Sequence, residues 1–197
     1  TTERFYIRDI QYDRYRLKNL EGNANFIENT LMLNNISAEL FRGRLKGELE
    51  LSFDSLRTFR LNLEFLYIDL ENFSETANLQ QKIKLSGTLS GKLSLEGTKD
   101  NFSFINGDFV TLPPGGEFSI KDNRYLERLA NQSGQALDLI MENFKNYYYN
   151  NGSLKLHLNK NNLEVKINLD GKNGKRNLDI TMHNFFNLLK GALLWEG

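Results

Sequence analysis

The residue types that most often catalyse reactions or bind metals are scarce in this chain. Its 197 residues include 2 histidines and no cysteine, so the sequence offers neither a thiolate zinc site nor a disulfide framework. His157 and His183 lie in separate segments, and neither has carboxylates at the spacing of a metal or acid–base site. We therefore predict structural or surface roles for both histidines.

Two other segments could carry chemistry but have simpler explanations. Residues 170–174 (DGKNG) resemble a calcium loop but lack its alternating oxygen ligands and closing glutamate, so a hairpin turn is expected. The basic residues here, Lys172, Lys175 and Arg176, are typical of a solvated loop. The run Tyr147-Tyr148-Tyr149 could stack on a ligand, but a strand in contact on both faces also explains it.

Enzymatic function has no support in the sequence. It contains neither a glycine-rich phosphate loop after a predicted strand nor a nucleophile elbow. We predict that the protein is not an enzyme and that it has no metal and no cofactor.

Composition narrows the function classes further. Lys+Arg and Asp+Glu both number 25, and this balance argues against a dedicated nucleic-acid-binding protein, which usually has a basic excess. No apolar run reaches the roughly 20 residues that span a bilayer, so we predict no transmembrane segment here. The chain starts at Thr1 without Met or a signal peptide, and we interpret it as an excised fragment of a longer protein.

Alternating polar and apolar residues predict strands along most of the chain. Residues 45–53 place Leu45, Leu49, Leu51 and Phe53 on one face and charged side chains on the other, and residues 59–67 repeat the pattern. We expect about ten or more strands joined by short turns, including strands over residues 83–89 and 92–96 and a strand pair that turns at Asn106-Gly107. Apolar side chains on both faces of residues 65–70 suggest a bulge or a strand covered on both sides.

These patterns predict a mainly β fold with minor α. We expect a large, curled, mostly antiparallel sheet, which either folds onto itself as a sandwich or forms an open groove. One long amphipathic helix is expected over residues 122–144, and a short C-terminal helix over residues 185–195. The apolar stripe of the long helix could cap the groove through Leu126, Leu129, Ile140 and Met141.

Several segments resemble a known family of bacterial envelope proteins. The glycine-spaced runs 85–97 (LSGTLSGKLSLEG) and 38–47 (AELFRGRLKG) resemble strand pairs of the AsmA-like proteins. The order PGGEF at 114–118, then a helix, then YY and GSLKL at 147–156, is similar to the C-terminal region of the YdbH family, once labelled "dicarboxylate transport". The resemblance covers roughly residues 38–194, whereas residues 1–36 resemble nothing that we recognise.

The resemblance implies a function. Such a chain would be a non-enzymatic lipid-binding or lipid-conducting module of a periplasmic protein, anchored in the inner membrane, that moves phospholipid between the inner and outer membranes of diderm bacteria and so supports outer-membrane homeostasis. Its partners would be phospholipid acyl chains, the rest of the parent chain and a small envelope protein. The resemblance implies that the chain is the C-terminal fragment of its parent protein. We expect a single β-rich domain over 1–197, with lead-in strands at 1–36, AsmA-like repeats at 38–112 and a YdbH-like region at 113–194.

The predicted groove lining comes from two neighbouring strand pairs. Its members are aliphatic or aromatic residues at alternate positions: Leu61, Leu63, Phe65, Leu85, Leu89, Leu93 and Leu95. An ordinary closed core explains each of these residues equally well. Two other functions stay open, namely a structural or protein-interaction module of the envelope and a dicarboxylate-binding protein. The latter would need convergent Arg or Lys side chains, and the sequence does not show such a cluster.

Overall fold

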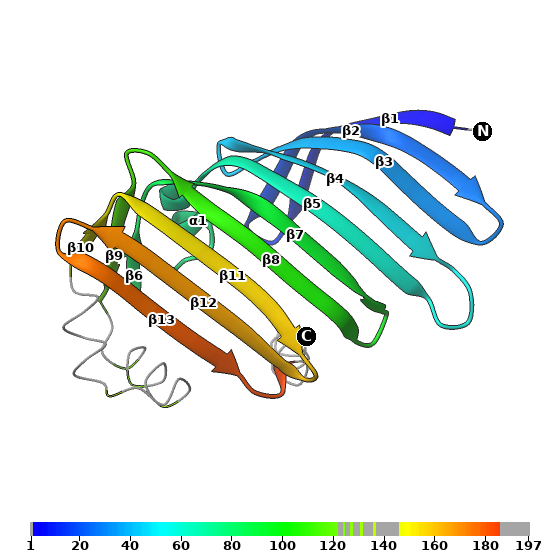
Figure 1. Cartoon of the computed structure of the whole chain (residues 1–197). Coiled ribbons are helices and arrows are strands. Elements are labelled where there is room, and N and C mark those ends of the chain that lie inside the picture. The colour runs from blue at the N-terminus through cyan, green and yellow to red at the C-terminus, as the bar shows by residue number, and fades with distance from the viewer. Residues whose placement is uncertain are drawn as a thin grey trace.

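The structure is a computed structural model, and it describes residues 2–121, 124, 127, 131, 136 and 146–185. A ten-stranded antiparallel sheet has the order β1-β2-β3-β4-β5-β7-β8-β11-β12-β13, and a three-stranded sheet has the order β10-β9-β6 (Figure 1). The strands of the large sheet are β1 (Thr2–Tyr12), β2 (Tyr15–Ile27), β3 (Thr30–Leu40), β4 (Gly43–Ser52), β5 (Thr58–Asp69), β7 (Thr88–Thr98), β8 (Phe102–Leu112), β11 (Asn151–Asn159), β12 (Asn162–Gly171) and β13 (Gly174–Met182). The small sheet comprises β6 (Ile83–Leu85), β9 (Gly116–Ile120) and β10 (Tyr147–Tyr149), and the helix α1 covers Leu70–Thr76.

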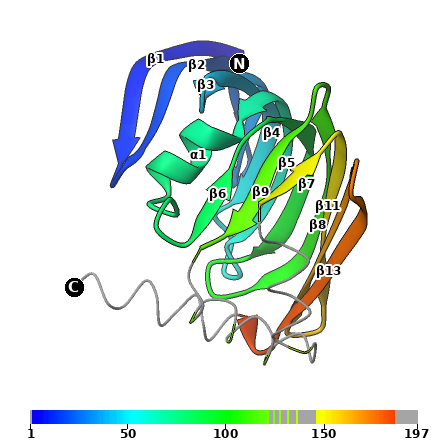
Figure 2. The same ribbon diagram turned by 90° about the vertical axis from the view of Figure 1, so that its left-hand side faces the viewer.

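The large sheet curves into a trough, and the smaller elements lie in its hollow. Figure 2 shows α1, β6 and β9 on the concave side of the curved sheet. The largest buried cluster sits between these two layers and includes Ile83 and Ile120 from the small sheet and Leu169 and Leu178 from the large one. The small sheet and α1 thus cover one part of the concave face, and the mainly β, antiparallel fold class is confirmed.

Short turns explain why neighbouring strands pair in sequence order. Two-residue turns join β1 to β2, β3 to β4 and β12 to β13. Asp13, Phe41 and Arg42 in these turns have positive φ, as the tightest hairpin turns require. The DGKNG segment is the β12–β13 hairpin, as the sequence predicts.

Three details of the predicted strands are wrong, each because of a glycine. Residues 83–89 do not form one strand, since Gly87 has φ +113° and the chain passes there from β6 in the small sheet to β7 in the large one. Gly91 and Gly107 lie inside β7 and β8 and end neither strand. A Cβ on Gly91 would lie 2.5 Å from Cδ1 of Phe109, so this glycine makes room for an aromatic ring and does not make a turn.

The helix α1 was not predicted from the sequence. Asp69 caps it, because its Oδ1 accepts a hydrogen bond from the Asn72 N–H at 3.0 Å. The predicted bulge before it is confirmed, since the pairing of β5 with β7 shifts register between Phe65 and Ile68. Nearly all of the predicted long helix at 122–144, including its cap residues Leu126, Leu129, Ile140 and Met141, lies outside the described residues, as does nearly all of the C-terminal helix at 185–195. Both helices therefore stay predictions. In the described part of the chain, no helix has the length and apolarity that a membrane crossing requires.

Candidate functional site

The concave face of the large sheet is apolar over most of its width. Directly opposed residues in neighbouring strands share a face, so the strand pairing arranges the inward side chains in rows across the sheet. We call this surface the concave face. Its rows are Leu33-Leu49-Leu61-Leu95-Ile105, Leu63-Leu93-Gly107-Leu156-Val165-Ile180, and Ala38-Leu45-Phe65-Gly91-Phe109-Leu154-Ile167-Leu178.

The opposite face of the sheet is polar and charged. The row Lys46-Glu64-Lys92-Asp108-Lys155 crosses five strands with alternating sign, and Lys155 lies 4.0 Å from Asp108. Arg60 contacts both neighbouring glutamates, Glu96 at 3.0 Å and Glu50 at 3.5 Å. The two faces therefore differ sharply in chemistry, and the apolar one has no counterpart sheet of equal size among the described elements.

Four predicted lining residues form one block on the concave face. Leu61 opposes Leu95 and Leu63 opposes Leu93, so all four side chains share a face of the β5–β7 pair. All four stay half-buried, although they lie in the middle of a wide sheet. This block differs from a closed core, where such leucines would be fully buried.

The other three predicted residues line a cavity under the small sheet. Phe65 and Leu89 reach it from the large sheet, and Leu85 reaches it from β6 in the covering layer. Leu85 therefore lines the cavity from the covering layer and does not extend the strand that carries Leu89, contrary to the prediction. The cavity volume is about 360 Å³, more than twice the roughly 150 Å³ that holds a benzene molecule in an engineered apolar cavity.

The cavity walls are almost entirely apolar. From the large sheet come Phe109, Leu154, Leu156, Ile167, Leu169, Leu178 and Ile180, and from the covering elements come Leu70, Phe73, Ile83 and Phe118. The hydroxyl side chains in the lining are those of Thr111, Ser153 and Tyr149, and the Tyr149 hydroxyl is bonded to the Ser86 carbonyl. Such a surface suits hydrocarbon, because it offers close contacts and almost no polar group that hydrocarbon would leave unpaired.

Hydrogen bonds from two buried tyrosines connect β10 to the segment after β6 and to the large sheet. Tyr147 and Tyr149 are buried, whereas Tyr148 between them is 63% exposed, so the triplet packs on one face. The Tyr149 hydroxyl donates to the Ser86 carbonyl oxygen at 2.6 Å, and burial raises the pKa of Tyr149 to about 12. The Tyr147 hydroxyl donates to the Gly174 carbonyl, and the Arg176 guanidinium lies 5.3 Å from the centre of its ring.

An ion pair joins two strands of the covering layer. Lys84 Nζ lies 2.6 Å from the Glu117 carboxylate, whose side chain is only 8% exposed. The hydrogen bond from Lys84 to Glu117 and the charge of this carboxylate raise the pKa of Lys84. The pair links β6 to β9 at the edge of the layer.

The histidines lie away from this apolar site. His157 is exposed on β11 and faces Asn106 and Glu164 on the polar side. His183 follows β13, with its Nδ1 3.3 Å from Oδ1 of Asn162. Within the described residues there is no group of three or more His, Cys, Asp or Glu side chains that could hold a metal ion.

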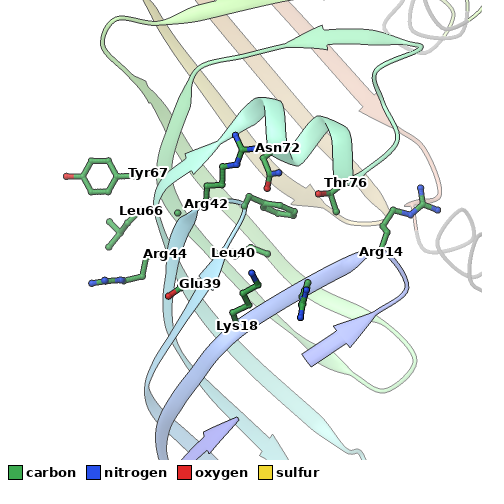
Figure 3. A pocket seen from close by; sticks show the side chains of 13 residues that line it. Arg14, Lys18, Glu39, Leu40, Arg42, Arg44, Leu66, Tyr67, Asn72 and Thr76 are labelled. Carbon is green, nitrogen blue, oxygen red and sulfur yellow. The ribbon is translucent and has the colours of Figure 1, made fainter. Parts of the chain in front are cut away.

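A basic cleft beside α1 was missed in the sequence (Figure 3). Its volume is about 790 Å³, and its lining includes Arg14, Arg16, Lys18, Arg42 and Arg44. The sequence does contain a signal, because the pattern Arg-x-Arg-Leu-Lys occurs at 14–18 and again at 42–46. The prediction that Arg and Lys side chains do not converge is therefore wrong, because the fold gathers five of them in this cleft.

Comparison with known proteins identifies a family whose model matches this chain. A model of the YdbH-like family, described as the intermembrane phospholipid transport protein YdbH, matches residues 9–190, which is most of the chain. Comparisons with curated proteins and with solved structures found no match.

Proposed function

Because the chain belongs to the YdbH-like family of intermembrane phospholipid transport proteins, we propose that its concave face carries phospholipid acyl chains in transit. The module is non-enzymatic, and it works by shielding hydrocarbon from water. The observation that supports this most strongly is the half-buried leucine block Leu61, Leu63, Leu93 and Leu95 next to an apolar cavity.

The energetics of lipid transfer favour such a surface. Exposing an acyl chain of about 16 carbons to water costs on the order of 13 kcal/mol at about 0.8 kcal/mol per CH₂. An apolar strip removes this cost at every position along it, and it needs no catalytic group. Leucine and isoleucine suit the task, since aliphatic contacts are non-directional and let a chain slide.

The dimensions of the trough also fit the proposal. Ten strands at a spacing of about 4.8 Å make the sheet roughly 43 Å wide along the direction in which the rows run. This width exceeds the roughly 30 Å hydrocarbon thickness of a whole bilayer. One module can therefore hold an acyl chain at several successive positions along the trough.

The family match supports a proposal for the cellular context. We place the module in the periplasm of a diderm bacterium, as part of a parent protein anchored in the inner membrane. The outer sides of β1 and β13 have no neighbouring strand among the described elements, and such edges can extend the trough by pairing with other parts of the parent chain. The predicted segments 1–36, 38–112 and 113–194 and the small envelope partner stay proposals.

The test is lipid retention by a protein purified without detergent from a Gram-negative host. Native mass spectrometry should detect bound phospholipid on the wild type and lose most of it in Leu93→Asp, because a carboxylate on the concave face repels hydrocarbon. The control is Ser94→Asp, one residue along β7 on the polar face, which should keep its lipid.

The outcomes separate the proposed functions. A wild type that melts cooperatively and carries no lipid would contradict lipid carriage and favour a structural or protein-interaction module of the envelope. Equal lipid loss in both variants would show that the leucine block is not the lining. Binding of succinate, with no lipid, would favour the dicarboxylate alternative.

A further inference from the structure

The basic cleft beside α1 and the apolar cavity under the small sheet are neighbours. Phe41 lines both, and its ring packs edge-on against Phe73 of α1 with ring centroids 5.3 Å apart. We call these two spaces the basic cleft and the apolar cavity. A molecule with a charged end and a hydrocarbon end could occupy both at once.

The helix α1 forms the partition between the two spaces. Leu70 and Phe73 line the apolar cavity, whereas Asn72 and Thr76 line the basic cleft. The last two residues are four apart and so lie on one side of the helix. This short helix therefore presents hydrocarbon to one space and hydrogen-bonding groups to the other.

The repeated Arg-x-Arg-Leu-Lys pattern explains why cations gather here. The first copy lies at the start of β2 and the second at the start of β4. Both strands pair antiparallel with β3, so they run in the same direction and begin at the same end of the sheet. The fold thus brings the two basic repeats to the same end of the sheet.

Electrostatics in the basic cleft favour an anion. Carboxylates hold three of the arginines, through the pairs Arg14–Asp13 at 2.8 Å, Arg16–Asp9, and Arg42–Asp69 at 3.2 Å. Lys18 and Arg44 lie opposite Glu39 on the two strands that flank β3. With Glu39 and the three partner carboxylates counted against the five basic side chains of the lining, one positive charge remains in excess.

The existing ion pairs do not block an incoming anion. They are solvent-exposed, with 68% of the Arg42 side chain accessible, and pairs of this kind contribute little to stability. A guanidinium has five N–H donors, so it can bind a phosphate while it keeps a carboxylate partner. In Figure 3, Arg42 and Asn72 approach from the side of α1, and Lys18 approaches from β2 across the cleft.

We propose that the basic cleft binds the phosphate-bearing headgroup of an anionic phospholipid while one of its acyl chains enters the adjoining apolar cavity. This inference rests on the proposed function and adds a preference for lipid charge. Phosphate is the fitting ligand, because planar guanidinium groups match its oxygens geometrically. The Phe41 ring lies at the junction of the two spaces, where headgroup and hydrocarbon would meet.

The experiment offers the full chain vesicles of equal parts phosphatidylglycerol and phosphatidylcholine. After the vesicles are removed by centrifugation, native mass spectrometry measures the bound lipids. The wild type should be enriched about fivefold or more in phosphatidylglycerol. The variant Lys18→Gln/Arg42→Gln should bind a similar total amount of lipid with an enrichment near one.

The matched control is Arg60→Gln/Lys92→Gln, which removes one arginine and one lysine from the polar face of the sheet, away from the cleft. It should keep the wild-type enrichment. Thermal melting checks that each variant is folded, and if the cleft variant does not fold, the single exposed substitution Lys18→Gln takes its place. Retained enrichment in the cleft variant, or lipid binding by the wild type without enrichment, would overturn the headgroup site.

Further measurements distinguish a lipid headgroup from free phosphate and from a membrane surface as the anion that the cleft binds. Inorganic phosphate alone should bind at least a hundredfold more weakly than the lipid, and equal binding would make this a site for free phosphate. A protein that sediments with the vesicles but carries no lipid after separation would dock on a membrane surface, which overturns the inference. If the wild type takes lipid from neither vesicle component, the proposed function itself fails.

Discussion

At the scale of single residues, the buried hydroxyl of Tyr149 makes the stability of the protein depend on pH. Its hydroxyl is buried and donates to the Ser86 carbonyl, and its pKa rises from 10.0 to about 12. The folded protein thus retains this proton between pH 10 and pH 12, where the unfolded chain releases it. Stability from this group is complete below pH 10 and is lost as the pH rises towards 12.

The substitution Tyr149→Phe isolates this effect. At neutral pH the variant should be less stable by about 1 kcal/mol, because it loses the hydrogen bond to Ser86. The wild type should then lose at most about 3 kcal/mol more than the variant between pH 10 and pH 12, since one pKa unit corresponds to about 1.36 kcal/mol. Urea unfolding at pH 8, 10, 11 and 12 measures the difference, and a constant difference would contradict this account.

Individual residues also show where the sequence was informative. Alternation placed Leu61, Leu63, Leu93 and Leu95 on one face, and the strand register confirms that they share it. It could not place Leu85, because the side-chain period is the same whether a strand belongs to the large sheet or to the layer above it. Gly87, with its positive φ, makes that difference, and a glycine in sequence does not reveal its φ.

At the scale of elements, α1 connects the parts of the candidate site. It is only seven residues long, so its own hydrogen bonds stabilise it weakly and its cap matters. Asp69 both caps the helix and pairs with Arg42 in the neighbouring hairpin turn. A helix this short lacks a clear periodic signal, which explains why the sequence pattern did not predict it.

Substituting Asp69→Ala should loosen α1. We expect a loss of about 1 kcal/mol in the free energy of unfolding from the missing cap, together with faster amide exchange across Leu70–Thr76. Hydrogen–deuterium exchange with mass spectrometry measures the local effect. Glu71→Ala, at an exposed position of the same helix, is the control and should leave exchange nearly unchanged. Equal protection in Asp69→Ala and the wild type would show that the cap does not hold the helix.

Pairing between elements was harder to predict than the elements themselves. The sequence indicated most strands and the antiparallel arrangement, because the alternation is regular and the turns are short. It left open whether the sheet would close into a sandwich, since both outcomes bury the same apolar positions. The two basic repeats, at residues 14–18 and 42–46, are distant in the sequence. They line one cleft because β2 and β4 both pair with β3.

At the scale of the whole molecule, the central feature is a trough with one apolar and one charged face. Its rows of leucine, isoleucine and phenylalanine continue from β3 to β13, and the small sheet covers only part of them. The proposed function uses the apolar face as a path for hydrocarbon, while the charged side chains stay on the other face. The family match to intermembrane phospholipid transport proteins agrees with this shape.

The most direct test of the claim that the concave face carries lipid is site-specific photocrosslinking along β5. A photoreactive amino acid replaces Leu61, Asn62, Leu63 or Glu64 one at a time, in cells labelled with radioactive phosphate. Lipid should crosslink at Leu61 and Leu63, which face the trough, and not at Asn62 and Glu64, which face outward. Equal crosslinking at all four positions, or none at any, would contradict the claim that the concave face carries lipid.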